Sequence, residues 1–264
     1  MPDENGIELV LHITASPRVV YGFFLEPEKF EQWMEKGSRL QLREGGHLEI
    51  RYPGGAPPAR GSVVEVVENR RIVFTWGYEG GANGLPPGAS RVLVELTPVD
   101  GGTRLTLRHT GLPNEELEQG HLGGWRHYFG VLAWRAARDA LGPVLEDRVD
   151  TLVDAWNEPE AERRRRLLEG CWEPDALFVD RMGYVPGLDA LDAFIANAHR
   201  FMPGVRLERT GEIFETHGRV RFPWKLTGPE GDVGAGWHVG KMSADGRFEE
   251  LAGFWDEVAT GVSR

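Results

Sequence analysis

The side chains that most often bind metals or act as nucleophiles are few and scattered in this chain. Cys171 is the single cysteine, which excludes an intramolecular disulfide and a thiolate metal cluster, and we interpret it as a small buried apolar residue. No two histidines stand four residues apart on an expected helix, no glycine-rich phosphate motif opens a helix, and no serine nucleophile elbow is present. The sequence therefore predicts no metal site and no bound cofactor.

A different kind of site is indicated by glycine and aromatic residues near the middle of the chain. His109-Thr110-Gly111-Leu112 has the pattern of a strand end, and Gly123-Gly124-Trp125 stands at the head of a long apolar-striped helix. Glycine allows two backbones to approach closely, and Trp125 supplies a large apolar plate that faces the sheet. These residues predict a cleft between a helix and a sheet.

Length and composition limit the class of protein. With 264 residues the chain exceeds one typical domain, so we expect two. The formal net charge of -11 argues against nucleic acid as a partner, because such binding requires a positive surface. Met1 to Gly6 lacks the features of a signal peptide, and no apolar run approaches the ~18 residues of a membrane span. We therefore expect a cytoplasmic protein with no membrane partner.

The first half of the chain has the pattern of a sheet bracketed by two helices. Ser16-Pro17 predicts the start of a short helix, and a period of 3.6 residues predicts a long one from about Asn114 to Leu141. Gly80 to Ala89 is rich in glycine and proline, which predicts a mobile loop. Alternating apolar and polar residues predict strands at Ile7 to Ile13, Leu40 to Tyr52, Gly61 to Glu68, Arg71 to Tyr78, Arg91 to Thr97 and Thr103 to His109.

Gly142-Pro143 is expected to end the long helix and the first domain, because glycine is a common C-cap and proline cannot continue helical hydrogen bonds. Three amphipathic helices then precede strands at Arg206 to Thr216, Arg219 to Thr227, Gly234 to Ser243 and Phe248 to Trp255. The predicted class is α+β, with domains at residues 1–142 and 143–264. The second is expected to be an α+β cone, a curved antiparallel sheet with three helices.

Four consecutive arginines, Arg163 to Arg166, resemble a nucleic-acid patch when taken alone. They follow Glu158, Glu160 and Glu162, so we interpret them as paired charges on the exposed face of a helix.

Short motifs along nearly the whole first half occur in the order and spacing of a known superfamily. They include Ile13-Thr14-Ala15-Ser16-Pro17, Glu31-Gln32-Trp33, Gly61-Ser62-Val63, Ile72-Val73-Phe74-Thr75-Trp76, Gly101-Gly102-Thr103, His109-Thr110-Gly111-Leu112 and Gly124-Trp125. Residues 1–142 thus resemble the START-like or SRPBCC (Bet v 1-like) superfamily, in the branch similar to the activator of heat-shock-protein-90 ATPase. The resemblance implies a helix-grip fold, in which a seven-stranded antiparallel sheet wraps around the C-terminal helix and an apolar cavity. It implies no reaction.

The second half carries a looser set of motifs. They are Trp156-Asn157-Glu158, Asp175-Ala176-Leu177-Phe178-Val179-Asp180, Gly187-Leu188-Asp189-Ala190-Leu191, Asp245-Gly246-Arg247-Phe248 and Gly253-Phe254-Trp255. Residues 143–264 thus resemble the nuclear transport factor 2-like superfamily, in the branch similar to ketosteroid isomerase and SnoaL-type polyketide cyclases. The resemblance implies a cone with an apolar floor and a homodimer formed through this domain.

The same resemblance assigns candidate roles to Asp180 and His238. Asp180 stands where isomerase-like members place a carboxylate general base, although Arg181 follows it where the family usually has proline. His238 stands where the isomerase branch has an acid that donates to the developing oxyanion, and a histidine can donate there too. A structural carboxylate and a satisfied histidine at the pocket wall are the alternatives.

Aromatic residues are the candidate ligand-cavity residues of both domains. They are Trp33, Trp76, Trp125 and Phe129 in the first domain, and Trp156, Tyr184, Trp224, Trp237 and Trp255 in the second. Aromatic walls suit flat ligands, but the same residues could fill the core of a small domain.

Three hypotheses about function follow. The first is a two-domain protein that binds a small apolar or aromatic molecule in one or both cavities. The second is a cofactor-independent isomerase or cyclase that uses Asp180 as general base. The third, from the family resemblance of the first domain alone, is a chaperone-associated interaction module.

Overall fold

The chain forms two compact α+β units. The structure, a computed structural model, describes residues 6–256. Residues 1–5, part of the segment considered for a signal peptide, lie outside the described residues. The first unit ends at Ala140 and the second begins at Leu141, two residues before the boundary expected at Gly142. Within residues 6–256, no helix is long and apolar enough to cross a membrane.

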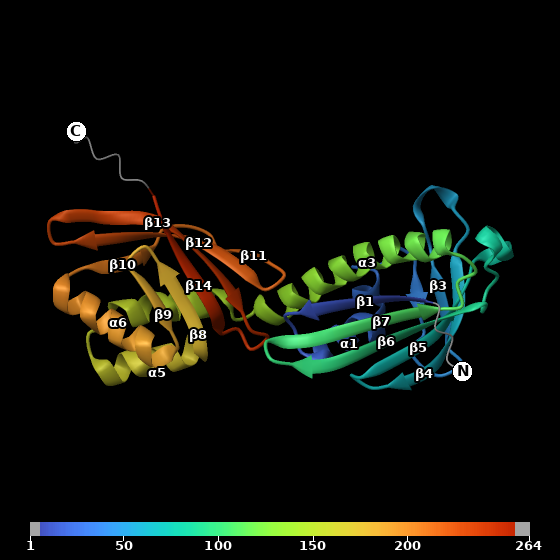
Figure 1. Cartoon of the computed structure of the whole chain (residues 1–264), viewed down its shortest axis with the longest axis horizontal. Helices are drawn as coiled ribbons and strands as arrows, with labels where there is room; N and C mark the ends of the chain where they lie inside the picture. Colours follow the sequence, from blue (N-terminus) through green and yellow to red (C-terminus); the bar gives the residue numbers. More distant parts are fainter. Residues whose placement is uncertain (1–5, 257–264) are drawn as a thin grey trace. The chain divides into compact units, whose positions relative to one another are not determined.

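The first unit is a seven-stranded antiparallel sheet in the order β1-β7-β6-β5-β4-β3-β2, with a long helix across one face (Figure 1). Its helices are α1 (Pro17–Leu25), α2 (Pro27–Phe30) and α3 (Glu115–Leu141). Its strands are β1 (Gly6–Ile13), β2 (Arg39–Leu40), β3 (His47–Ile50), β4 (Ala59–Val67), β5 (Arg71–Trp76), β6 (Ser90–Val99) and β7 (Gly102–Thr110).

Polar side chains cap α1 and α3 where the sequence predicts their starts. The Ser16 hydroxyl accepts a hydrogen bond from Val19 N, and Pro17 occupies the first turn of α1. The Asn114 carbonyl oxygen Oδ1 accepts from Leu117 N at 2.9 Å and caps α3. The strand expected over Leu40 to Tyr52 is interrupted, because the chain turns at Gly45 with a φ of +71°.

The segment Gly80 to Ala89, expected to be a mobile loop, is anchored to the first unit. A 3₁₀ helix, η2 (Glu79–Gly84), contains Gly80, Gly81 and Asn83 at positive φ. Leu85 is 1% exposed, and its carbonyl accepts from Tyr78 N at 2.7 Å. Burial of one leucine side chain stabilises the segment by about 2 kcal/mol, which the composition of the loop did not reveal.

The second unit packs helices against a second seven-stranded sheet in the order β10-β12-β13-β14-β8-β9, with β11 beside β12. Its helices are α4 (Leu145–Asn157), α5 (Ala161–Cys171) and α6 (Leu188–Phe201). Its strands are β8 (Trp172–Asp180), β9 (Gly183–Pro186), β10 (Arg206–Arg209), β11 (Phe214–Thr216), β12 (Arg219–Gly228), β13 (Gly231–Met242) and β14 (Phe248–Trp255).

This sheet departs from the expected pattern in two places. The pairing of β14 with β8 is parallel, whereas the expected cone is antiparallel throughout. The strand expected over Arg206 to Thr216 is split into β10 and β11. Pro223 of the neighbouring β12 causes the break, because it has no N–H to donate and its ring lies against Gly211.

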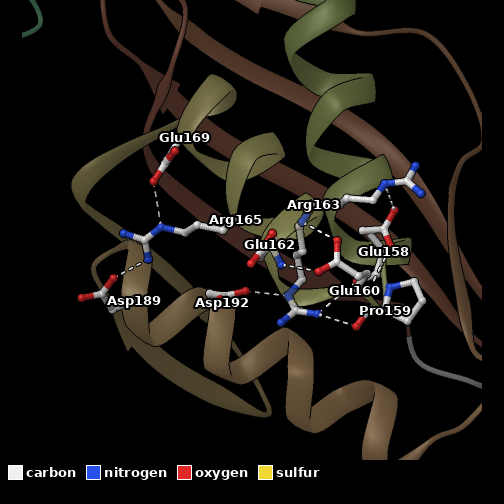
Figure 2. A network of polar contacts seen from close by, with 10 residues as sticks. Glu158, Pro159, Glu160, Glu162, Arg163, Arg165, Glu169, Asp189 and Asp192 are labelled. Carbon is white, nitrogen blue, oxygen red and sulfur yellow. Dashed lines mark hydrogen bonds and ion pairs between the residues drawn. The ribbon is translucent and has the colours of Figure 1, made fainter.

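The arginine run on α5 forms a network of polar contacts (Figure 2). Arg163, Arg165 and Arg166 make ion pairs with carboxylates at the surface, as expected. Arg164 differs, since it is 3% exposed and its Nε lies 2.5 Å from Asp192 Oδ1 on α6. Its Nη1 also donates to the Glu158 and Pro159 carbonyls. The prediction of a fully exposed arginine face is therefore wrong for Arg164.

Cys171 is expected to be unreactive in the folded protein. It is completely buried, and burial raises the pKa of its thiol to about 12. Because the thiolate is the reactive species, 5,5′-dithiobis(2-nitrobenzoate) should label Cys171 only after the second unit unfolds. Rapid labelling in native buffer, at the rate seen in urea, would contradict this burial.

Candidate functional site

A cavity inside the second unit has a volume of about 590 Å³. Its wall combines α4, α6, the strands of the sheet and the turn after β8. The lining residues are Trp156, Phe178, Asp180, Arg181, Met182, Phe194, Asn197, Ala198, His199, Phe201, Met202, Val205, Leu207, Trp224, Leu226, Val233, His238 and Trp255. Asp180 and His238, which sequence analysis selects separately, thus line one cavity.

Asp180 is held by three N–H donors at the end of β8. Its Oδ1 accepts from Met182 N at 2.7 Å and from Gly183 N at 2.9 Å, and its Oδ2 accepts from Trp255 Nε1 at 3.2 Å. The Arg181 guanidinium stacks on the Trp255 ring, 4.0 Å from its centroid. A carboxylate has about four acceptor sites, so these contacts orient Asp180 and leave little of its capacity unused.

His238 lies on the inner face of β13 among aromatic rings. It is 4% exposed and stacks on Trp224, with ring centroids 5.5 Å apart and an interplanar angle of 29°. Burial lowers the pKa of His238 to about 3, so its imidazole is neutral near pH 7. Its Nδ1 is shielded from solvent and has no hydrogen-bond partner in the described part of the chain.

Gly253 on β14 brings the two candidate residues together. A Cβ atom at Gly253 would lie 3.1 Å from Asp180 Cβ and 3.5 Å from His238 Nε2. Only the absence of a side chain there leaves room between the carboxylate and the imidazole. A neutral histidine and an ionisable carboxylate on one apolar wall can hold a polar group of a ligand.

Three of the five aromatic residues selected in the second half line this cavity: Trp156, Trp224 and Trp255. Tyr184 and Trp237 do not, and their side chains are 74% and 36% exposed. Side chains alternate between the faces of a strand, so Trp237 must point away from the face that carries His238. Sequence analysis could not assign these faces, because it had no register for the strands.

The other cavity lies between α3 and the sheet of the first unit and has a volume of about 310 Å³. Its lining residues are Met34, Ile50, Tyr52, Trp76, Tyr78, Asn83, Leu117, Gly120, His121, Gly124, Trp125 and Tyr128. Sequence analysis selects Trp76 and Trp125 but misses the tyrosines and His121. The sequence held a signal for part of this lining, because five of its residues recur at intervals of three or four positions and so share one helix face. They are Leu117, Gly120, His121, Gly124 and Tyr128.

Trp33 and Phe129, the other two aromatic residues selected in the first half, are core residues. They are 3% and 0% exposed, and their rings pack with centroids 5.3 Å apart. Trp33 Nε1 donates to the Phe23 carbonyl at 2.9 Å, so its one polar atom is satisfied within the core. Neither residue is among those that line the cavity, so both contribute to the core.

Two buried histidines beside the smaller cavity have opposite tautomers. His121 Nδ1 lies 2.7 Å from the Leu117 carbonyl, which can only accept, so Nε2 is left to accept from the Tyr78 hydroxyl at 3.1 Å. His109 Nδ1 accepts from Trp125 Nε1, so its Nε2 donates to the Ser90 hydroxyl. Burial lowers the pKa of both imidazoles, that of His109 to about 3.

The glycines of α3 serve a different purpose from the one expected. The sequence predicts close approach of helix and sheet backbones at Gly123-Gly124, but a Cβ at either residue, or at Gly120, would meet no atom within 4 Å. Gly120 and Gly124 line the cavity one helical turn apart. They keep space open at the cavity, although glycine costs a helix roughly 0.5–1 kcal/mol relative to alanine.

Gly124→Ala is therefore expected to stabilise the first unit by about 0.5–1 kcal/mol, because the new methyl group enters open space in a helix. Urea unfolding at equilibrium measures the change. Gly61→Ala is the contrasting variant: its Cβ would lie 1.7 Å from the Thr75 carbonyl oxygen, so it should destabilise the same unit. Equal effects of the two variants would contradict this view of α3.

Among residues 6–256, no three histidine, cysteine, aspartate or glutamate side chains gather in a geometry that could hold a metal ion.

Comparisons with known proteins match a family model to the first unit. Residues 14–135 match the family described as Activator of Hsp90 ATPase homolog 1-like protein. The first unit carries this family's sequence pattern. An AHSA1-like protein from Rhizobium etli, solved in solution, is 36% identical over 52% of this chain and 84% of its own, with a TM-score of 0.42.

A crystal structure of a SnoaL-like family protein from Agrobacterium tumefaciens is also similar to this chain. The two are 31% identical over 43% of this chain and 98% of that protein, with a TM-score of 0.41. The search of curated proteins found no match. The chain is thus similar to AHSA1-like and to SnoaL-like proteins.

Proposed function

We propose that the second unit binds a flat, largely apolar molecule in its cavity of about 590 Å³. The observation that carries this proposal is an aromatic wall that remains open: Trp156, Phe178, Trp224 and Trp255 surround the space instead of filling it. Aromatic walls with a few polar groups are typical of small-molecule sites. Exposed apolar residues at the rim, Met182 and Phe201, extend the same surface outward.

Unpaired nitrogens define the polar part of the proposed ligand. Trp156 Nε1, Trp224 Nε1 and His238 Nδ1 all belong to lining residues and have no hydrogen-bond partner in the described chain. Leaving a buried donor unsatisfied costs about 1–3 kcal/mol, so such groups call for an explanation. An acceptor oxygen on the ligand would satisfy an indole N–H. We therefore propose an aromatic ligand that carries such an oxygen.

Binding of 9-fluorenone and of fluorene, which lacks the carbonyl oxygen, tests this proposal by quenching of tryptophan fluorescence. We expect fluorenone to bind about tenfold more tightly, and Trp224→Phe to remove that preference. Ala198→Trp should abolish binding of both, because it fills the cavity. Binding that survives Ala198→Trp unchanged, or no binding of either compound to the parent chain, would overturn the proposal.

The two units are proposed to be separate domains: a START-like helix-grip domain over residues 1–142 and a nuclear transport factor 2-like, SnoaL-like domain over residues 143–264. The family match at residues 14–135 supports the first assignment. Helices followed by a curved sheet around a cavity support the second.

A second candidate function is isomerase or cyclase chemistry, with Asp180 as general base and His238 as oxyanion donor. The observation that favours it is their joint position beside Gly253 on one cavity wall.

Asp180→Asn removes the base while keeping an acceptor oxygen for the Met182 and Gly183 amides. The measurement is the rate at which the α-protons of an enolisable ketone such as 1-tetralone exchange in D₂O. In Asp180→Asn this rate should fall by at least a hundredfold. Unchanged exchange in the variant would refute this role of Asp180.

We further propose that the second unit forms a homodimer through its outer sheet face, which consists of Tyr184, Phe214, Trp237, Val239 and Phe254. All five side chains are exposed. Strand register places Trp237 beside Phe254 and Val239 beside Ala252, so the apolar side chains are contiguous. The same face carries charges of both signs, Arg221 and Glu250 among them, which suits pairing with a second copy.

Sedimentation equilibrium of the full chain at micromolar concentration tests this interface. A dimer is expected, and Phe254→Glu should make it monomeric. Leu25→Glu, at an exposed apolar residue of α1, is the matched control and should remain dimeric. A monomeric parent chain, or equal dissociation of both variants, would refute the interface.

A further inference from the structure

The smaller cavity, in the first unit, is enclosed by a nearly continuous set of aromatic rings. Tyr52 and Tyr78 pack with centroids 6.3 Å apart, Trp76 contacts Tyr78 at 6.4 Å, and Trp76 contacts Trp125 at 5.1 Å. Tyr128 on α3 adds a further ring to the wall. The faces of such rings carry partial negative charge.

The hydroxyl hydrogens around this cavity are directed at other protein atoms. Tyr78 donates to His121 Nε2, since the tautomer of His121 is fixed by the Leu117 carbonyl. The Tyr128 hydroxyl donates to Glu35 Oε1, whereas Trp76 Nε1 is buried and has no hydrogen-bond partner in the described chain. Apart from the Trp76 N–H and the Asn83 side-chain amide, the wall offers a ligand ring faces and oxygen lone pairs. These are electron-rich groups.

Carboxylates stand near this cavity, and Arg51, between the lining residues Ile50 and Tyr52, is paired with Glu49 at 3.0 Å. No lysine or arginine is among the lining residues of the described chain. Glu35 accepts a hydrogen bond of 3.4 Å from the Tyr128 hydroxyl. Three further glutamates, Glu115, Glu116 and Glu118, stand in the first turn of α3, beside the lining residue Leu117. A cation is therefore favoured over an anion at this site.

We propose that this cavity is an aromatic cage that binds a small organic cation, of the quaternary ammonium class. Cations over aromatic faces are attracted by the ring quadrupole, most strongly when desolvated. The open space at Gly120 and Gly124 accommodates the methyl groups of such a cation. This site is separate from the cavity of the second unit and does not depend on the function proposed there.

Calorimetric titration of the full chain with choline tests the cage, with 3,3-dimethylbutan-1-ol as the uncharged molecule of the same shape. We expect choline to bind at least tenfold more tightly. Tyr78→Phe, which keeps the ring, should retain most of the affinity, whereas Tyr78→Leu should lower it about tenfold. Equal binding of the charged and uncharged molecules would overturn the proposal, as would no binding of choline at about 10 mM.

Two leucine variants on α3 locate the site. Gly124→Leu places its side chain in the cavity and should abolish choline binding. Gly123→Leu is the matched control, because Gly123 is exposed, does not line the cavity, and has equally open space for a Cβ. Circular dichroism of both variants verifies that α3 is intact. Choline binding that is the same in both variants would place the cation elsewhere and refute the cage.

Discussion

Arg164→Ala is expected to lower the free energy of unfolding of the second unit by about 3–5 kcal/mol, because it breaks a buried ion pair. Arg164 is 3% exposed and joins α5 to Asp192 on α6, while its Nη1 donates to the Glu158 and Pro159 carbonyls. Alanine would leave a partly buried carboxylate and two carbonyls without their donor. Cys171, buried in the same unit, provides the measurement through its rate of labelling in increasing urea.

Arg165 is the control for this prediction, since it is adjacent in sequence and also makes ion pairs, to Glu169 and Asp189. Its side chain is 39% exposed and that of Asp189 is 90% exposed. Surface ion pairs contribute about 0–1 kcal/mol, so Arg165→Ala should shift the labelling curve only slightly. If both variants shift the curve equally, burial of Arg164 does not determine its contribution.

The contrast between Arg164 and its neighbours shows why the sequence alone does not predict which charged side chain is buried. The glutamates that precede the four arginines correctly indicate ion pairing on α5. Which of four consecutive arginines points inward depends on how α5 packs against α6, and that packing follows from contacts distant in the sequence.

Hydrophobic periodicity and turn residues predict the α+β class and most helices and strands, because these patterns reflect local backbone geometry. They do not predict the parallel pairing of β8 with β14 or the break opposite Pro223, which depend on partner strands. The same limit applies to the cavities. Trp237 and His238 are neighbours in sequence but lie on opposite faces, and only the strand register assigns each to its face.

The candidate site is predicted only in part for a similar reason. Sequence selects Asp180 and His238 individually, and the structure places both on one cavity wall beside Gly253. The hydrogen bonds of Asp180 cannot be anticipated, because its donors come from the following turn and from Trp255, 75 residues away. In the first unit, a glycine pair suggests close packing, whereas the structure shows open space.

Acidification is expected to destabilise each unit through buried histidines, chiefly His109 in the first, where burial also lowers the pKa of His121, and His238 in the second. Burial holds the pKa of His109 and of His238 near 3, below the ordinary value of about 6.5. The unfolded chain therefore takes up a proton below pH 6.5 while the folded chain does not, so stability is fully present above about pH 6.5. The free energy of unfolding falls as the pH drops toward 3. Each buried histidine lowers it by up to about 1.4 kcal/mol for every pH unit.

Urea unfolding between about pH 7 and pH 4.5 measures this loss of stability. At pH 4.5 each of the two structural units should have lost about 2–3 kcal/mol. His109→Gln keeps a donor for the Ser90 hydroxyl and an acceptor for Trp125 Nε1 but cannot be protonated. It should reduce the pH dependence of the first unit and leave the smaller part that His121 contributes. His47→Gln, at an exposed position, should leave that dependence as it is in the parent chain. A steep profile that persists in His109→Gln would assign acid sensitivity to other groups.

The two histidines should respond differently to a ligand. Both nitrogens of His109 have protein partners, so nothing bound in a cavity can change its hydrogen bonds directly. His238 Nδ1 has no partner in the described chain, and an acceptor oxygen placed beside it would stabilise a protonated nitrogen there. If fluorenone occupies the second cavity as proposed, it should raise the pKa of His238 and reduce the acid sensitivity of the second unit alone. Nuclear magnetic resonance of the imidazole Cε1–H groups would separate the two titrations, and an unchanged His238 resonance at saturating fluorenone would place the carbonyl oxygen elsewhere.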